Sequence, residues 1–122
     1  MNTFNSQSTL RVGNKEFEFF SLEKAEKAGA GAVSNLPLSL KVMLENLLRF
    51  EDGSTVMADD IRALAGEASA KHSAKEIAFR PARVLMQDFT GVPAIVDLAT
   101  MRDVIKEMGG DPKRINPLQQ VD

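Results

Sequence analysis

The stretch VLMQDFTGVPAIVDLATMRDVIKEM, residues 84–108, contains a change of hydrophobic period that decides the fold. It opens on three consecutive apolar residues, Val84 to Met86, a run typical of a buried strand covered on both faces. Apolar residues then recur at the three- and four-residue spacing of a helix as far as Met108. The pattern therefore predicts a strand near 83–87 and one or two helices between 92 and 108.

The junction between this strand and helix is predicted to be a tight turn. Thr90-Gly91 supplies turn residues, and Pro93 suits the first turn of a helix, where its missing N–H costs nothing. A second break is possible in the pattern near Thr100. The order strand, turn, helix is typical of α/β proteins.

A β-hairpin is predicted near the amino terminus. Apolar residues alternate with polar ones over 10–12 and again over 17–19, and Gly13-Asn14 between them is a turn sequence. We expect the apolar faces of the two strands to pair. Residues 1–8 have no apolar period, so we expect a flexible lead-in there.

Helices fill the region between the hairpin and the strand. The longest amphipathic pattern, LPLSLKVMLENLLRF at 36–50, predicts a helix over 37–50. Shorter helices are predicted near 21–28 and 56–65. Residues 66–76 lack an apolar period and are predicted to form a loop.

Composition limits the classes of function. The 122 residues suit a single domain, and 43% hydrophobic with 26% charged residues is a globular composition. A net charge of −2 provides no overall basic field for nucleic acid or an acidic membrane. We expect a cytoplasmic protein, because no apolar run approaches the roughly 18 residues of a membrane helix and the first residues do not resemble a secretory signal.

The inventory of reactive side chains is short. There is no cysteine, so the chain offers no disulfide, thiolate nucleophile or sulfur ligand for an iron–sulfur cluster. A single histidine, His72, cannot form a zinc site by itself, and its polar neighbours favour a solvated loop over a catalytic role.

Gln87 is the strongest candidate for a ligand-binding residue. It follows the predicted strand and precedes the helix, and ligands of open α/β sheets bind beyond the carboxyl ends of strands. Its amide can donate and accept hydrogen bonds without carrying charge, which suits the carboxylate or hydroxyl of a small polar substrate. The alternative, favoured by position alone, is that Gln87 caps or braces the turn.

Other polar residues near this position have ordinary structural explanations. Asp88 could act as a base or metal ligand, but an Asp beside a turn more often accepts hydrogen bonds from local backbone amides. Thr90 suits an N-cap or turn hydroxyl. Arg80 and Arg83 could together clamp an anion, or each could pair with an acidic residue of a neighbouring segment.

The literal residue string allows a more specific interpretation. FRPARVLMQDFTGVPAIVDLATMRD at 79–103 closely resembles the amino-terminal region of the aconitase A and iron-regulatory-protein family, and its bacterial branch most of all. Three further segments resemble the same family in unbroken order: its first long helix in LPLSLKVMLENLLRFEDG at 36–53, its next helix in DIRALAG at 60–66 and a later turn in GGDPKRINPLQQVD at 109–122. The resemblance covers about residues 10–122.

This resemblance implies an aconitate hydratase, a hydro-lyase that interconverts citrate and isocitrate through cis-aconitate with a [4Fe-4S] cluster. Its implied fold is the amino-terminal part of the α/β/α domain of that family, incomplete over residues 9–122. Gln87 matches the family's glutamine that contacts substrate. The resemblance assigns no role to Asp88 or Thr90.

The resemblance also implies that much of the enzyme lies outside these residues. Members of the family are several times longer, and their cluster cysteines, Asp-His pair, substrate arginines and catalytic serine follow the matched region. Because this chain has no cysteine, we expect it to hold no cluster and to be inactive without the remainder of the polypeptide. The alternative is a stand-alone interaction module that binds RNA, which the net charge of −2 disfavours.

Overall fold

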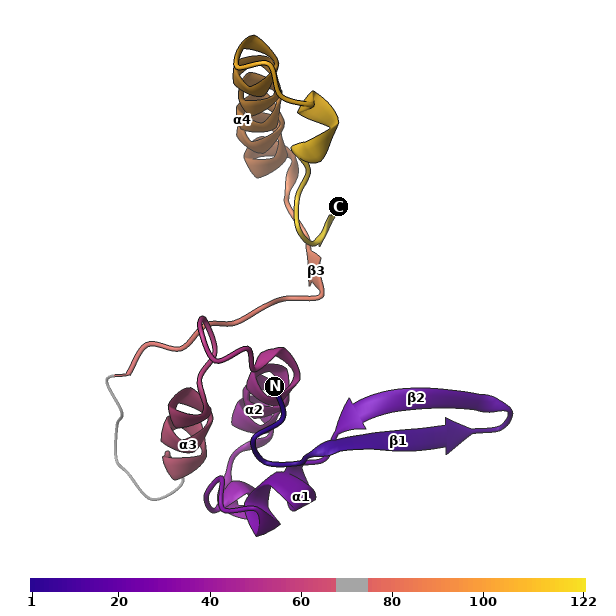
Figure 1. Ribbon diagram of the computed structural model, residues 1–122, viewed down its shortest axis with the longest axis vertical. Helices are drawn as coiled ribbons and strands as arrows, with labels where there is room; N and C mark the ends of the chain where they lie inside the picture. The colour runs from indigo at the N-terminus through magenta and orange to yellow at the C-terminus, as the bar shows by residue number, and fades with distance from the viewer. Residues whose placement is uncertain (68–74) are drawn as a thin grey trace. The chain divides into compact units, whose positions relative to one another are not determined.

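The computed structural model describes residues 1–67 and 75–122, and the chain divides into two compact units, Met1–Arg80 and Pro81–Asp122 (Figure 1). Over the described residues it is a mixed α/β chain with two small two-stranded sheets. His72 and most of the loop predicted at 66–76 lie outside the described residues.

The first unit begins with the predicted hairpin. Strands β1 (Gln7–Val12) and β2 (Lys15–Phe20) pair antiparallel, with Leu10 opposite Phe17, so the prediction is confirmed. Gly13 makes the turn with a φ of +61°, a conformation that glycine adopts without steric cost. The hairpin extends away from the helices (Figure 1), and Leu10 and Phe17 are about half exposed.

Helices of the first unit lie close to their predicted positions. Their bounds are α1 (Leu22–Lys27), the 3₁₀ turn η1 (Val33–Asn35), α2 (Leu38–Phe50) and α3 (Ala58–Gly66). Ser21 is the N-cap of α1, and its hydroxyl accepts a hydrogen bond from the Lys24 N–H at 3.2 Å. Each predicted end differs from the observed one by no more than two residues.

The core of this unit is formed by one face of α2 and of α3, closed by residues from the connecting segments. Leu44 in α2 and Ile61 in α3 are completely buried. The other large apolar residues of the core are Phe4, Val33, Leu36, Leu47, Leu48, Val56 and Leu64. Burial of this many aliphatic side chains is the main contribution to the stability of the unit.

The first residues of the chain pack differently from the flexible lead-in expected over 1–8. Phe4 is 2% exposed and Ser6 is completely buried, while the Thr3 N–H donates to the Glu51 carboxylate at 2.8 Å. The last two residues of that range already belong to β1. A single aromatic residue has no period that sequence reasoning could detect, and its burial is a tertiary effect.

Arg80 is held at the end of the first unit by its backbone and its side chain. The Asn46 amide donates to the Arg80 carbonyl at 2.7 Å and accepts from the Arg80 N–H at 3.0 Å. The Arg80 guanidinium lies 3.1 Å from the Asp52 carboxylate and 5.6 Å from the centre of the Phe50 ring. The segment that leads into the second unit is therefore fixed against α2 at Arg80.

Asp52 closes the turn after α2. Hydrogen bonds from the Thr55 hydroxyl and from the backbone N–H groups of Val56 and Ser54 hold the pKa of its carboxyl well below its usual range. The charged form of Asp52 is thus present to pair with Arg80 across the whole neutral range of pH.

Asn46→Ala should destabilise the first unit by about 1–2 kcal/mol, because it leaves the N–H and carbonyl of Arg80 without their protein partners. Urea unfolding followed by circular dichroism measures the change. Asn35→Ala is the matched control, since Asn35 is exposed and its side chain makes no hydrogen bond among the described residues. Equal effects of the two substitutions would contradict a specific role for the amide of Asn46.

The second unit consists of one long helix, a 3₁₀ turn and a short parallel sheet. Its elements are β3 (Arg83–Val84), α4 (Asp88–Glu107), η2 (Pro112–Arg114) and β4 (Gln120–Val121). Strands β3 and β4 are parallel, and the Met86 N–H continues their ladder by donating to the Asp122 carbonyl at 2.8 Å. The strand predicted at 83–87 is correct in place but shorter.

The predicted start of the long helix is wrong. Helix α4 begins at Asp88 instead of near residue 92, so Thr90-Gly91 lies within its first turn and makes no separate turn. Pro93 lies inside the helix as its sixth residue, where it lacks the N–H that would donate to the Phe89 carbonyl. There is no break near Thr100, whose hydroxyl donates to the Val96 carbonyl at 3.0 Å within one continuous helix.

Candidate functional site

A groove of about 630 Å³ lies in the second unit, beside α4 from Asp88 to Met101. It is lined at one end by Met86 and Gln87, which follow β3, and by the last residues of the chain at the end of β4, so it lies at the carboxyl ends of two parallel strands, the place where α/β sheets bind ligands. Most of its lining is apolar: Met86, Gly91, Ala94, Ile95, Leu98, Met101, Pro117 and Val121.

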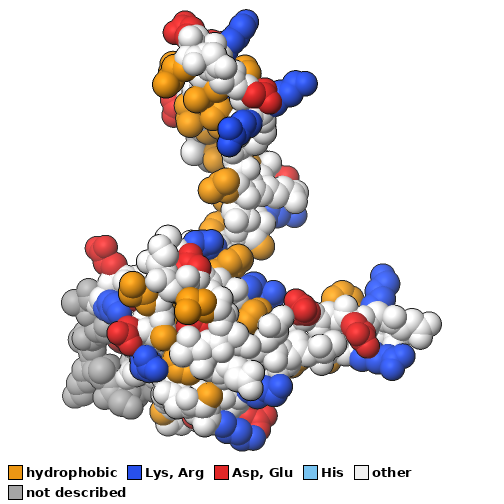
Figure 2. All heavy atoms as spheres, in the orientation of Figure 1, with side chains coloured by type: hydrophobic (Ala, Val, Ile, Leu, Met, Phe, Trp, Pro, Cys, Tyr) orange, Lys and Arg blue, Asp and Glu red, His pale blue; other side chains and the backbone are white. Residues whose placement is uncertain are grey.

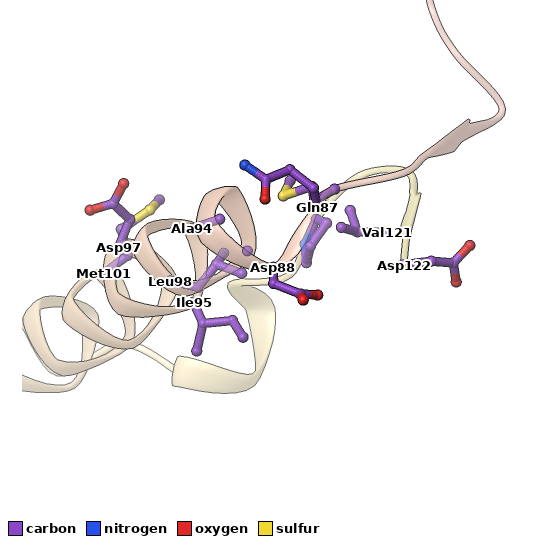
Figure 3. Close-up of a pocket in the computed structure, with 12 residues that line it drawn as sticks. Gln87, Asp88, Ala94, Ile95, Asp97, Leu98, Met101, Val121 and Asp122 are labelled. Atoms are coloured by element: carbon purple, nitrogen blue, oxygen red, sulfur yellow. The ribbon is translucent and has the colours of Figure 1, made fainter.

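Gln87 lies at this end of the groove, between β3 and α4 (Figure 3). Its side-chain oxygen accepts a hydrogen bond from the Phe89 N–H at 3.0 Å, which makes Gln87 the N-cap of α4. Its amide nitrogen donates to the Thr90 hydroxyl at 3.3 Å. The capping interpretation of Gln87 is therefore confirmed, and the same residue also lines the groove.

The two hydrogen bonds of Gln87 leave part of its amide available. An amide nitrogen carries two hydrogens, and one of them is directed to Thr90. The other makes no hydrogen bond among the described residues, and the side chain is exposed. The cap thus fixes the orientation of an amide that still has one N–H to offer a ligand.

The charged residues of the groove are all acidic. Asp88, Asp97 and Asp122 line it, and no Lys or Arg does so among the described residues. Asp122 forms an ion pair with Arg83 and accepts a hydrogen bond from Gln120 at 3.2 Å. Asp97 lies farther along α4 than Gln87, with Ala94 between them (Figure 3).

Asp88 and Thr90 differ from their predicted roles. The Asp88 carboxylate accepts no backbone hydrogen bond in the described part of the chain, contrary to the prediction. As the first residue of α4 it is stabilised instead by the positive end of the helix dipole. Thr90 is an acceptor for Gln87 inside the helix and does not cap it.

The two arginines do not form an anion clamp. Arg80 pairs with Asp52 in the first unit, and Arg83 pairs with Asp122 in the second. The alternative prediction, that each would pair with an acidic residue of another segment, is confirmed. His72 lies outside the described residues.

Sequence reasoning missed the contribution of the chain's last residues to the groove. Arg102 holds this segment against α4, because its guanidinium donates to the Ile115 carbonyl at 3.0 Å and to the Asn116 side chain at 2.7 Å. This brings Pro117 and Val121 to the groove. The alternation of apolar and polar residues near 115–121 is too short to signal this packing.

Residues 1–67 and 75–122 contain neither a cluster of metal ligands nor a membrane-spanning helix. There, no three His, Cys, Asp or Glu residues are placed so that they could share a metal ion. In the same ranges no helix is both long and apolar enough to span a bilayer.

Comparison with known proteins places the chain in a family. Residues 59–122 match the aconitase family (aconitate hydratase). The chain is 57% identical to aconitate hydratase A of Streptomyces viridochromogenes over 117 residues, which are 96% of this chain and 12% of that protein. It is 55% identical to aconitate hydratase A of Escherichia coli, again over 96% of this chain but 13% of the relative.

A third relative extends the match to the whole chain. Aconitate hydratase A of Pseudomonas aeruginosa is 55% identical over 100% of this chain, which corresponds to 14% of that protein. The chain therefore spans only about one-eighth to one-seventh of the length of these relatives. The matched residues include the groove and Gln87. On this evidence the chain belongs to the aconitase family.

Proposed function

We propose that this chain is the amino-terminal part of an aconitate hydratase, a hydro-lyase that interconverts citrate and isocitrate through cis-aconitate. The observation that carries the proposal is the identity of 55–57% to three bacterial proteins named aconitate hydratase A, over at least 96% of the chain. Because the chain spans 12–14% of those proteins, the reaction is proposed for a whole polypeptide and not for these residues alone.

Within that polypeptide, Gln87 is proposed to contact the substrate. Its N–H that is free of the cap can donate to a carboxylate or hydroxyl oxygen of citrate, and the hydrogen bonds to Phe89 and Thr90 fix the amide beforehand. Glutamine is also an unusual N-cap, since Ser, Thr, Asp and Asn are preferred there. A purely structural position would be filled better by one of those shorter residues.

The charge needed to bind a tricarboxylate must come from outside the groove. Three carboxylates line it, and no Lys or Arg does so among the described residues, so an anion would be repelled here without added cations. We therefore propose that other parts of the polypeptide supply the positive charge. The net charge of −2 disfavours the alternative of a stand-alone RNA-binding module.

The [4Fe-4S] cluster implied by the family does not fit the residues of this chain. Such clusters are held by cysteine thiolates, and the chain has no cysteine. We propose that the remainder of the polypeptide holds the cluster, and no step of the reaction through it is assigned to residues of this chain.

A chimera tests the proposed function. This chain replaces the matched 117 residues of the Escherichia coli relative, and the interconversion of citrate and isocitrate is measured after purification. We expect turnover within about tenfold of the natural enzyme, since replacements at half the positions preserve the fold when the core pattern is kept. A folded chimera that holds its cluster but has no turnover would contradict the proposal.

A further inference from the structure

The first half of α4 has the composition of a helix enclosed by protein. Phe89 and Val92, which do not line the groove, are 86% and 64% exposed, and Ile95 in the groove is 67% exposed. No residue of α4 is buried. A surface helix has a polar face and an apolar face, whereas a helix that is apolar on all sides belongs in the interior of a protein. Figure 2 shows apolar side chains gathered on the surface of this unit.

The sheet beside the groove is equally incomplete. Strands β3 and β4 form a two-stranded parallel sheet, and neither has a second strand neighbour among the described residues. Parallel sheets occur almost only where protein covers both faces. The groove therefore lies between two elements, a helix and a sheet, whose exposed surfaces both require further protein.

The acidic charge of the groove limits which protein surfaces can cover it. Asp88 and Asp97 have no ion-pair partner in the described part of the chain, whereas Asp122 is paired with Arg83. Enclosing two unpaired carboxylates in an apolar site is costly unless a cation accompanies them. The surface that covers this groove should therefore carry at least one Lys or Arg among its apolar residues.

From these observations we infer that the groove is a docking site for a polypeptide segment with apolar side chains and at least one Lys or Arg, supplied by the part of the aconitase polypeptide outside these 122 residues. The inference rests on the proposed function. Its occupant follows from length and charge together: relatives match 96–100% of this chain, groove included, and have about six to seven times as much further polypeptide. The groove thus binds protein along α4 and leaves Gln87 at its end for the substrate.

Hydrogen exchange of α4 tests this inference in the chimera and in the isolated chain. We expect the α4 amides to exchange at least about 100-fold more slowly in the chimera, because a docked segment must leave before the helix opens. The α2 amides are the internal control, since Leu44, Leu47 and Leu48 are buried in the first unit and should protect α2 in both proteins. Equal exchange of α4 in the two proteins would overturn the inference.

This measurement separates the inference from the proposed function. A protected α4 in a chimera without turnover would support docking while contradicting the reaction. An unprotected α4 in an active chimera would overturn docking alone. If α4 of the isolated chain is protected only when sedimentation shows a dimer, a second copy occupies the groove and the inferred occupant is wrong.

Two charge-reversal substitutions test whether the docked segment carries a Lys or Arg. Asp97→Lys should speed exchange of the α4 amides in the chimera by about five- to tenfold, because it places a cation against the cation of the docked segment. Asp103→Lys makes the same change in charge on the same helix but outside the groove, and should have little effect. Equal effects of the two reversals would overturn the claim that the segment carries a Lys or Arg.

Discussion

Gln87→Ser in the chimera should lower kcat/KM for citrate by about 100-fold without unfolding α4. Serine is among the preferred N-cap residues, so its hydroxyl can replace the hydrogen bond that the Gln87 oxygen accepts from the Phe89 N–H at 3.0 Å. It cannot reach as far as the amide N–H that we assign to the substrate. Loss of one positioned hydrogen-bond donor at a reacting group costs about 100- to 1000-fold in rate. Steady-state kinetics with citrate and isocitrate, beside a thermal melt, measures both effects.

The control for Gln87→Ser is a second Gln→Ser substitution in the same unit. Gln119→Ser removes an amide that does not line the groove and makes no hydrogen bond among the described residues, so turnover should be unchanged. If Gln87→Ser keeps full turnover and a normal melting temperature, the residue is a helix cap and has no contact with substrate. A loss of turnover together with a lower melting temperature in that variant would show a structural role instead.

The elements of the first unit could be predicted because their signals are local. Ser21 is followed within a turn by the amide that it caps, and Gly13-Asn14 makes the hairpin turn in two residues. The helix at Leu38–Phe50 has an apolar face whose period is visible in the sequence, and that face forms the core. Phe4 could not be placed, because one aromatic residue in a polar segment has no period.

The second unit was predicted less well because its signals conflict. Pro93 is typical of a helix start, yet α4 begins five residues earlier because Gln87, a weak capping residue by type, supplies the cap. Strand β4 has two residues and depends on pairing with Arg83–Val84, more than thirty residues away. Such pairing is a tertiary interaction that no local pattern signals.

For the site itself, the sequence predicts the position of Gln87 beyond a strand, and the structure agrees. It predicts neither the groove nor its acidic charge. The groove is completed by the last residues of the chain, which Arg102 holds against α4 through a contact that spans 13 residues to the Ile115 carbonyl. Ion pairs of Arg80 and Arg83 are predicted as an alternative, but their partners, 28 and 39 residues away, are not identified for the same reason.

Leu44→Ala should lower the free energy of unfolding of the first unit by about 3 kcal/mol, within the range of 2–5 kcal/mol for buried leucines. Leu44 is completely buried between α2 and the rest of the core, and truncation leaves a cavity there. The chain has neither Trp nor Tyr, so urea unfolding is best followed by circular dichroism. Leu118→Ala is the matched control, because Leu118 is 97% exposed and its loss should change stability by less than about 0.5 kcal/mol.

Leu44→Ala also tests whether the two units are stabilised by different parts of the polypeptide. All residues of the buried core, from Phe4 to Ala65, belong to the first unit, so the loss caused by Leu44→Ala should be equal in the isolated chain and in the chimera. Helix α4 has no buried residue, and its protection should depend on the added polypeptide. A much larger loss from Leu44→Ala in the chimera would mean that the first unit also depends on protein outside these residues. An equal loss would show that the first unit folds without the added polypeptide, and that it precedes the strand leading to Gln87 as an independently stable unit.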